Sequence, residues 1–80
     1  MKLEEFIILE PTTQRTVAFE IGAHLGDRFE PGSLVSLYQV DSFYVEAFYQ
    51  PRNRRLLSLV AFTDTDRLLP YLNHIDISME

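Results

Sequence analysis

The chain has 80 residues, of which 46 % are apolar, and its formal net charge at pH 7 is −5. This length predicts a single domain covering residues 1–80, and the acidic balance argues against a general affinity for nucleic acid. The absence of cysteine excludes disulfides and thiolate metal sites, and the two histidines, His24 and His74, are far apart in the sequence. No apolar run approaches a membrane span, so we expect a cytoplasmic protein without a cofactor.

The first two predicted elements are helical. Between residues 3 and 9, apolar side chains recur at roughly helical spacing. A second helix is expected from Pro11 to Ile21, because proline is favoured at the first helical position and Gly22 stands where a helix would stop. Residues 14–21 also alternate as they would in a strand, and this alternative stays open, although the proline start and glycine stop favour the helix.

Four strands are predicted next, each separated from its neighbour by a turn signal. The first covers residues 24–29 and ends at Pro31-Gly32, a strong turn signal. The others cover residues 34–40, 43–50 and 55–62, which are rich in aromatic and β-branched side chains. Asp41-Ser42 is short enough for a two-residue hairpin loop, and residues 51–54 form the last turn.

A final helix is predicted after residue 63, because Asp64, Thr65 and Asp66 are typical of a helix start. Pro70 should distort or restart this helix, since proline lacks a backbone N–H. Its apolar face would consist of Leu68, Leu69, Tyr71, Leu72 and Ile75, and residues 75–78 are expected to lie on the body of the protein. The fold class is therefore α+β: a four-stranded antiparallel meander with N-terminal helical segments and a C-terminal helix packed on one face.

Several short stretches of the chain resemble small uncharacterised bacterial proteins of similar length. They are Leu-Tyr-Gln-Val-Asp-Ser-Phe-Tyr-Val-Glu at residues 37–46, then Tyr49, Asn53, Pro-Tyr-Leu at 70–72 and Ile-Asp-Ile at 75–77. The resemblance spans most of the chain and implies a bacterial protein. No known activity accompanies it, so it implies no catalytic residue.

Alternation of side chains along the strands divides the predicted sheet into two faces. If Val40 pairs with Phe43 and Gln50 pairs with Arg55, one face is almost entirely apolar. The small residues that form one row across this face are Ser36, Ala47 and Ser58. A helix could lie close to the sheet along such a row, so we assign the helices and the core to this face. A slip of one residue would exchange the faces.

The opposite face is also apolar, although a sheet covered on one side should be polar on the other. An exposed apolar patch of this kind marks an interaction site, most simply a homodimer interface. The predicted interface residues are Val35, Leu37, Tyr44, Glu46, Phe48, Leu57 and Leu59. Two alternatives stay open: a helix or the tail covers this face, or a small molecule or another protein binds there.

One carboxylate lies in the middle of this second face. Glu46 would need a cationic partner among its apolar neighbours, and Arg28 is the nearest candidate. Together with His24 and Tyr44 these residues resemble an acid–base cluster, which is a candidate ligand site. An ordinary ion pair is the simpler interpretation, since no nucleophile or glycine-rich phosphate loop accompanies the cluster. We therefore expect a non-enzymatic protein–protein interaction module.

Three arginines, Arg52, Arg54 and Arg55, are concentrated in the last turn between strands. Arginines beside aromatic side chains suit an anionic ligand or a single-stranded nucleic acid, which gives an alternative function as a binding module. A solvated hairpin tip is the simpler interpretation, because charges there protect strand ends from mispairing.

Overall fold

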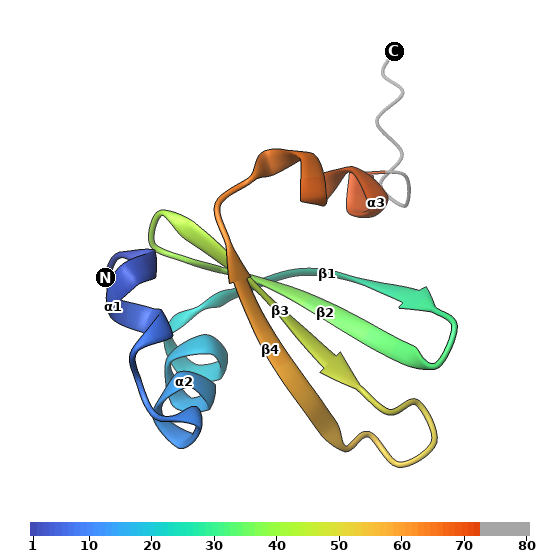
Figure 1. Cartoon of the computed structure of the whole chain (residues 1–80). Coiled ribbons are helices and arrows are strands. Elements are labelled where there is room, and N and C mark those ends of the chain that lie inside the picture. Colours follow the sequence, from blue (N-terminus) through green and yellow to red (C-terminus); the bar gives the residue numbers. More distant parts are fainter. Residues whose placement is uncertain (73–80) are drawn as a thin grey trace.

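The computed structural model describes residues 1–72, which form one antiparallel sheet with helices on both of its faces (Figure 1). In chain order the elements are α1 (Leu3–Ile7), α2 (Pro11–Thr16), the π-helix η1 (Val17–Ile21), β1 (Ala23–Glu30), β2 (Ser33–Val40), β3 (Phe43–Tyr49), β4 (Leu56–Phe62), the 3-10 helix η2 (Thr65–Leu68) and α3 (Leu69–Leu72). Each strand pairs with the next one along the chain. The predicted α+β meander is confirmed, and the interpretations of Ile75 and of residues 75–78 lie outside the described residues.

Residues 14–21 are helical, as the flanking proline and glycine predicted. Pro11 occupies the first turn of α2, where its missing N–H costs no hydrogen bond. The chain then continues without a break into η1, and the N–H of Gly22 donates to the carbonyl of Val17 at 3.0 Å, five residues earlier. Gly22 itself is extended, so the helix ends there.

The three hairpin turns position the strands much as the sequence indicates. Gly32 has a φ of 85° and Asp41 a φ of 52°, the left-handed conformation that tight turns require and that Gly and Asp tolerate. Val40 pairs with Phe43 across the second turn. At the third turn, the N–H of Gln50 donates to the carbonyl of Arg55 at 2.8 Å, so both predicted pairings are present.

A bulge in β4 reverses the predicted faces of that strand. Tyr49 pairs with Leu56, but Phe48 pairs with Ser58, which leaves Leu57 without an opposite residue. Every later residue of β4 therefore points to the face opposite to the expected one. Leu59 lies opposite Ala47, so Ser58 does not belong to the row of small residues. The assignment of Leu59 to the Glu46 face is wrong for the same reason, and Leu57, as the extra residue of the bulge, has no partner on β3.

A second bulge lies in β1. His24 pairs with Tyr38 and Gly26 pairs with Leu37, so Leu25 is the extra residue. The extra residue reverses the alternation of side chains in the part of β1 that follows it. His24 therefore points to one face of the sheet and Arg28 to the other. The predicted grouping of His24 with Arg28 is therefore wrong.

The helices divide between the two faces, and each group buries its own core. On one face, the cluster of buried residues consists of Phe6, Val17, Ala18, Val40, Phe43 and Val45. The rings of Phe6 and Phe43 are 5.3 Å apart, which fixes α1 against the sheet. On the other face, η2 and α3 help to cover a second cluster, Val35, Leu37, Phe62 and Tyr71. The assignment of all helices to one face is wrong, since Tyr71 lies on the face opposite to Phe6.

The segment after β4 begins and restarts as the sequence predicted. A carboxylate oxygen of Asp64 accepts a hydrogen bond from the N–H of Asp66 at 2.9 Å, which caps η2. The 3-10 turn changes to α-helix at Leu69, so Pro70 lies in the first turn of α3. Within residues 1–72, no helix has both the length and the apolar character needed to cross a membrane.

Gly22 gives a test of how closely η1 approaches the sheet. A Cβ at this position would overlap the carbonyl oxygen of Ala18 and lie 3.1 Å from Cγ2 of Val40. We expect Gly22→Ala to lower the free energy of unfolding by about 1–3 kcal/mol, because neither the helix backbone nor the core can move freely. Urea unfolding followed by circular dichroism measures this change. Gly26→Ala is the matched control, since its Cβ would approach nothing closer than a Tyr71 ring atom at 4.0 Å.

Candidate functional site

The most concentrated group of ionisable side chains surrounds Glu46 in the middle of β3. Glu46 is only 1 % exposed. Its Oε2 accepts from the hydroxyl of Tyr71 at 2.7 Å and from Nη2 of Arg28 at 3.3 Å. Its Oε1 accepts from Nη2 of Arg67 at 3.1 Å. Both oxygens therefore have donors, and two of the three donors are cationic.

The donors come from elements on either side of Glu46 and are themselves held in place. Arg28, on β1, also donates to Glu30 at 3.1 Å, and its guanidinium lies 5.6 Å from the centre of the Tyr71 ring. The guanidinium of Arg67, on η2, lies 4.7 Å from the centre of the Phe62 ring. The cluster therefore ties β1, β3 and the segment after β4 together.

The pKa values of the donors reflect this arrangement. Burial raises the pKa of the Tyr71 hydroxyl, and its hydrogen bond to Glu46 raises it further. Burial opposes the charged form of Arg28, but hydrogen bonds with Glu30, Tyr71 and Glu46 outweigh it, and the pKa of Arg28 rises. Among the buried side-chain nitrogen and oxygen atoms of residues 1–72, only Nε of Arg28 lacks a hydrogen-bond partner. The raised pKa values keep the Tyr71 hydroxyl protonated and the Arg28 guanidinium charged at neutral pH.

This geometry makes the cluster a structural connection between elements. A general acid or base must reach the proton that it transfers, and the Glu46 carboxylate has almost no contact with solvent. A substrate could reach it only if η2 and α3 moved away. The predicted pair of Glu46 and Arg28 is present, but its environment is that of an interior ion cluster.

Of the other two members of the predicted ligand site, Tyr44 lies on the Glu46 face and His24 does not. His24 is exposed on the opposite face, where its Nε2 is 2.8 Å from Oδ1 of Asp27. Tyr44 pairs with Phe62, and the two rings stack with their centres 5.6 Å apart. The acid–base cluster proposed from the sequence is therefore divided between two faces.

Sequence reasoning missed two members of the cluster, Arg67 and Tyr71. They follow Glu46 by 21 and 25 residues and lie four positions apart, so they fall on one side of the η2–α3 segment. The sequence did contain a signal for them. A carboxylate that is buried under a helix needs hydrogen-bond donors from that helix, and the arginine and the tyrosine are the strongest side-chain donors in this segment.

The predicted interface on this face is mostly covered by the chain itself. Val35, Leu37 and Glu46 are buried, and the half-buried Tyr44 and Phe48 pack against the second core cluster. The expectation of an exposed apolar face is wrong, because η2 and α3 cover it. Leu57 is 53 % exposed at the bulge, and Leu59 packs against the core on the other face.

The arginine turn is exposed, and one of its members lies beside an acidic group. Arg54 lines a depression of about 300 Å³ together with Asp27, Ser36, Tyr38 and Tyr49. Burial works to raise the pKa of Asp27, but hydrogen bonds with His24 and Ser36 and the charge of Arg54 lower it overall. The positive charge of Arg54 is thus partly balanced within the chain, whereas Arg52 and Arg55 face solvent.

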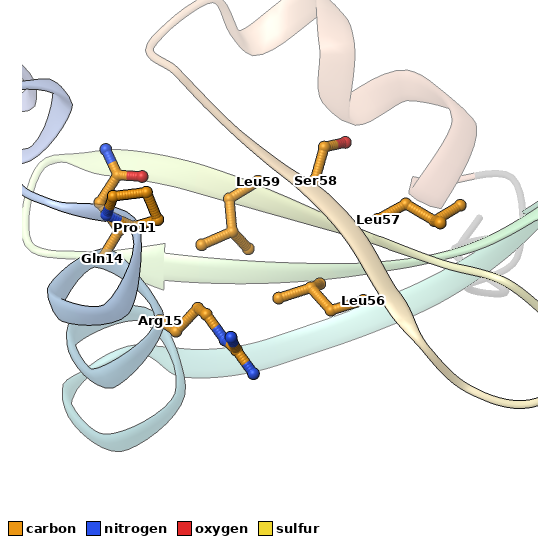
Figure 2. A pocket seen from close by; sticks show the side chains of 7 residues that line it. All are labelled: Pro11, Gln14, Arg15, Leu56, Leu57, Ser58 and Leu59. Carbon is orange, nitrogen blue, oxygen red and sulfur yellow. The ribbon is translucent and has the colours of Figure 1, made fainter.

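A different exposed feature lies along β4, the outer strand on one side of the sheet. A groove of about 200 Å³ runs between this strand and α2, lined by Pro11, Gln14, Arg15, Leu56, Leu57, Ser58 and Leu59. Figure 2 shows Leu56 and Leu59 reaching from β4 toward the α2 side, while Ser58 points the other way. The bulge at Leu57 produces this arrangement, since it places Leu56 and Leu59 on one face.

The ion cluster predicts a large cost for a neutral amide at Glu46. Glu46→Gln should lower the free energy of unfolding by about 3 kcal/mol, because the largely buried Arg28 loses the anion that compensates its burial and Arg67 loses its ion-pair partner. Glu30→Gln is the control, since Glu30 is the less buried partner of Arg28 and its removal should cost less than about 1 kcal/mol. Urea unfolding measures both variants. Equal losses in the free energy of unfolding would contradict the structural role of the cluster.

The buried tyrosines predict a loss of stability in alkali. Burial, followed by the neighbouring Tyr38, raises the pKa of Tyr49 from 10.0 to about 12, and that of Tyr71 is also raised. The folded state therefore holds these protons more tightly than the unfolded state. Their contribution is complete below pH 10 and is lost as the pH rises through the folded pKa.

Urea midpoints measured between pH 9 and pH 12, a range of about one to two units around the tyrosine pKa, should therefore fall with rising pH. The double variant Tyr49→Phe/Tyr71→Phe should show a flatter dependence, although it starts from a lower stability at neutral pH. An identical slope in the variant and in the unmutated chain would show that these hydroxyls do not cause the loss.

Comparisons with known proteins give no further identification. The chain matches no protein-family model, no curated protein and no solved structure. Within residues 1–72, the geometry that bears on function consists of a closed ion cluster, two covered sheet faces and the edge of β4.

Proposed function

We propose that the protein is a non-enzymatic protein–protein interaction module of the bacterial cytoplasm that forms a homodimer through the outer edge of β4. The observation that carries this proposal is the character of that strand. The seven residues of β4, Leu-Leu-Ser-Leu-Val-Ala-Phe, include no charge and no proline. The N–H and C=O groups on the outer side of an edge strand are free to pair with another strand.

The two edges of the sheet differ in a way that supports this choice. β1 carries Asp27, Arg28 and Glu30 within its length and a bulge at Leu25 in its first half. Charges and bulges are the devices that prevent edge strands from pairing with other chains. β4 has a bulge only near its first residue, at Leu57, and its remaining five residues are regular and uncharged. One edge is thus protected and the other is not.

The surroundings of β4 add apolar area to the backbone hydrogen bonds. Leu57 is 53 % exposed, and Leu56 and Leu59 line the groove beside α2. A strand placed against β4 would cover this groove with alternate side chains, which is how strand addition gains both affinity and specificity. Because both sheet faces are covered by helices within residues 1–72, the edge takes the place of the face as the interaction surface.

The alternative function as a ligand or nucleic-acid module has less support. Arg28 and Glu46 satisfy each other in the interior, His24 lies on the other face, and Arg54 lies beside Asp27. Only Arg52 and Arg55 remain as free cations of that candidate site, and the net charge of −5 opposes binding to a polyanion.

The mass of the protein in solution tests the proposal. Sedimentation equilibrium or light scattering should give twice the 9.3 kDa of one chain. Ser58→Lys should lower the mass toward one chain without unfolding it, because Ser58 is exposed and a lysine on an edge strand opposes pairing. Phe29→Lys is the matched control on the β1 edge, where the side chain is 77 % exposed, and should leave the mass unchanged. A chain that stays monomeric at millimolar concentration would overturn the proposal.

A further inference from the structure

The charges at the two ends of β4 have opposite signs. Arg54 and Arg55 immediately precede the strand, and Asp64 and Asp66 follow it within four residues. All four residues are exposed. The strand between them is neutral, so β4 and its flanks form a linear surface that is positive at one end and negative at the other.

We propose that two copies of the chain pair their β4 strands antiparallel about a two-fold axis at Val60, so that Arg54 and Arg55 of each copy lie beside Asp64 and Asp66 of the other. This pairing rests on the proposed function and specifies its geometry. The bulge at Leu57 limits the regular outer edge to Ser58–Phe62, and Val60 is the middle of that stretch.

The register follows from the position of the axis. Opposite residues then have numbers that are equally far from 60, so Leu59 faces Ala61 of the second copy and Ser58 faces its Phe62. Leu59 and Ala61 both pack on the α1 side of the sheet, so apolar groups meet apolar groups on that face. Outside the regular stretch this numbering no longer applies, because the bulge at Leu57 lies on one side and η2 on the other. The antiparallel direction still brings the flank with Arg54 and Arg55 toward the flank of the second copy that carries Asp64 and Asp66.

The charges also select the direction of pairing. In a parallel arrangement the arginines of both copies would lie at one end and the aspartates at the other, so that like charges would be adjacent. Two copies that each carry a net charge of −5 also repel each other as a whole. Local contacts between unlike charges offset this repulsion only in the antiparallel arrangement, and the protected β1 edges stop further growth of the joined sheet.

A charge exchange tests the pairing. An acidic variant, Arg54→Asp/Arg55→Glu, and a basic variant, Thr63→Lys/Asp66→Lys, each place like charges side by side at both ends of the interface. The basic variant keeps Asp64, because its carboxylate caps η2. Each variant alone should dimerise about tenfold or more weakly than the unmutated chain, since several exposed pairs change from attraction to repulsion. A one-to-one mixture should recover the affinity as a mixed dimer, which native mass spectrometry identifies from the two masses.

Single cysteines test the position of the axis, because the chain has no cysteine of its own. Residues directly opposite in an antiparallel pair have Cα atoms about 4.5–5.5 Å apart, within the range of a disulfide. Val60→Cys should therefore form a covalent dimer on mild oxidation. Phe29→Cys, on the β1 edge, is the control and should remain a single chain under the same conditions.

The outcomes separate this inference from the proposed function. A dimeric unmutated chain whose mixed charge variants recover no affinity, or whose Val60→Cys variant forms no cross-link, overturns the pairing and leaves the homodimer. A chain that is monomeric at millimolar concentration, including one in which residues 73–80 occupy the β4 edge of their own chain, overturns both.

Discussion

Glu46 places a negative charge at the centre of a sheet face, where it has almost no access to water. Removing a carboxylate from water costs several kcal/mol, and the cost is recovered only if donors satisfy both oxygens. Arg28 comes from β1, whereas Arg67 and Tyr71 come from the segment that follows β4. The short helices η2 and α3 are too small to be stable alone, so this cluster, together with the apolar contacts of Tyr71, determines where they lie.

The position of η2 and α3 in turn determines which surfaces remain for other molecules. They cover Val35 and Leu37, which would otherwise be open to solvent, while α1 and η1 cover Phe43 and Val45 on the other side. A small sheet that is covered on both faces can pair with another molecule only along its edge strands. The Glu46 cluster therefore acts on function indirectly, since it removes a face from the set of candidate interfaces and leaves β4 as the uncharged edge.

The elements of the fold were predictable from the sequence, because each one is bounded by a local signal. Pro11 and Gly22 mark the ends of the second helical segment, and Gly32 and Asp41 supply the left-handed turn conformations. The faces were less predictable. A bulge inserts one residue without changing the composition of the strand, and the leucine at residue 57 is as suitable for a regular strand as for a bulge.

The candidate site was predictable in part for the same physical reason. The pairing of Glu46 with Arg28 follows from the regular ladder of β2 and β3, which no bulge interrupts between these residues. The bulge at Leu25 lies before Arg28 and moved only His24. The contributions of Arg67 and Tyr71 depend on which face of the sheet the chain crosses after β4. This could not be predicted, because the bulge at Leu57 reversed the faces of the strand that leads into this segment.

The interior cluster also shapes the charge on the surface. The chain has seven lysines and arginines against twelve acidic residues, and Glu46 holds two of the seven, Arg28 and Arg67, against the sheet. Three of the remaining five lie in the single turn before β4, so most of the positive charge outside the cluster is at one end of this strand. Acidic residues are spread over the rest of the chain and include the cap at the other end. The difference in charge between the two ends of β4 therefore follows from the same arrangement of charges that holds η2 and α3 over the sheet.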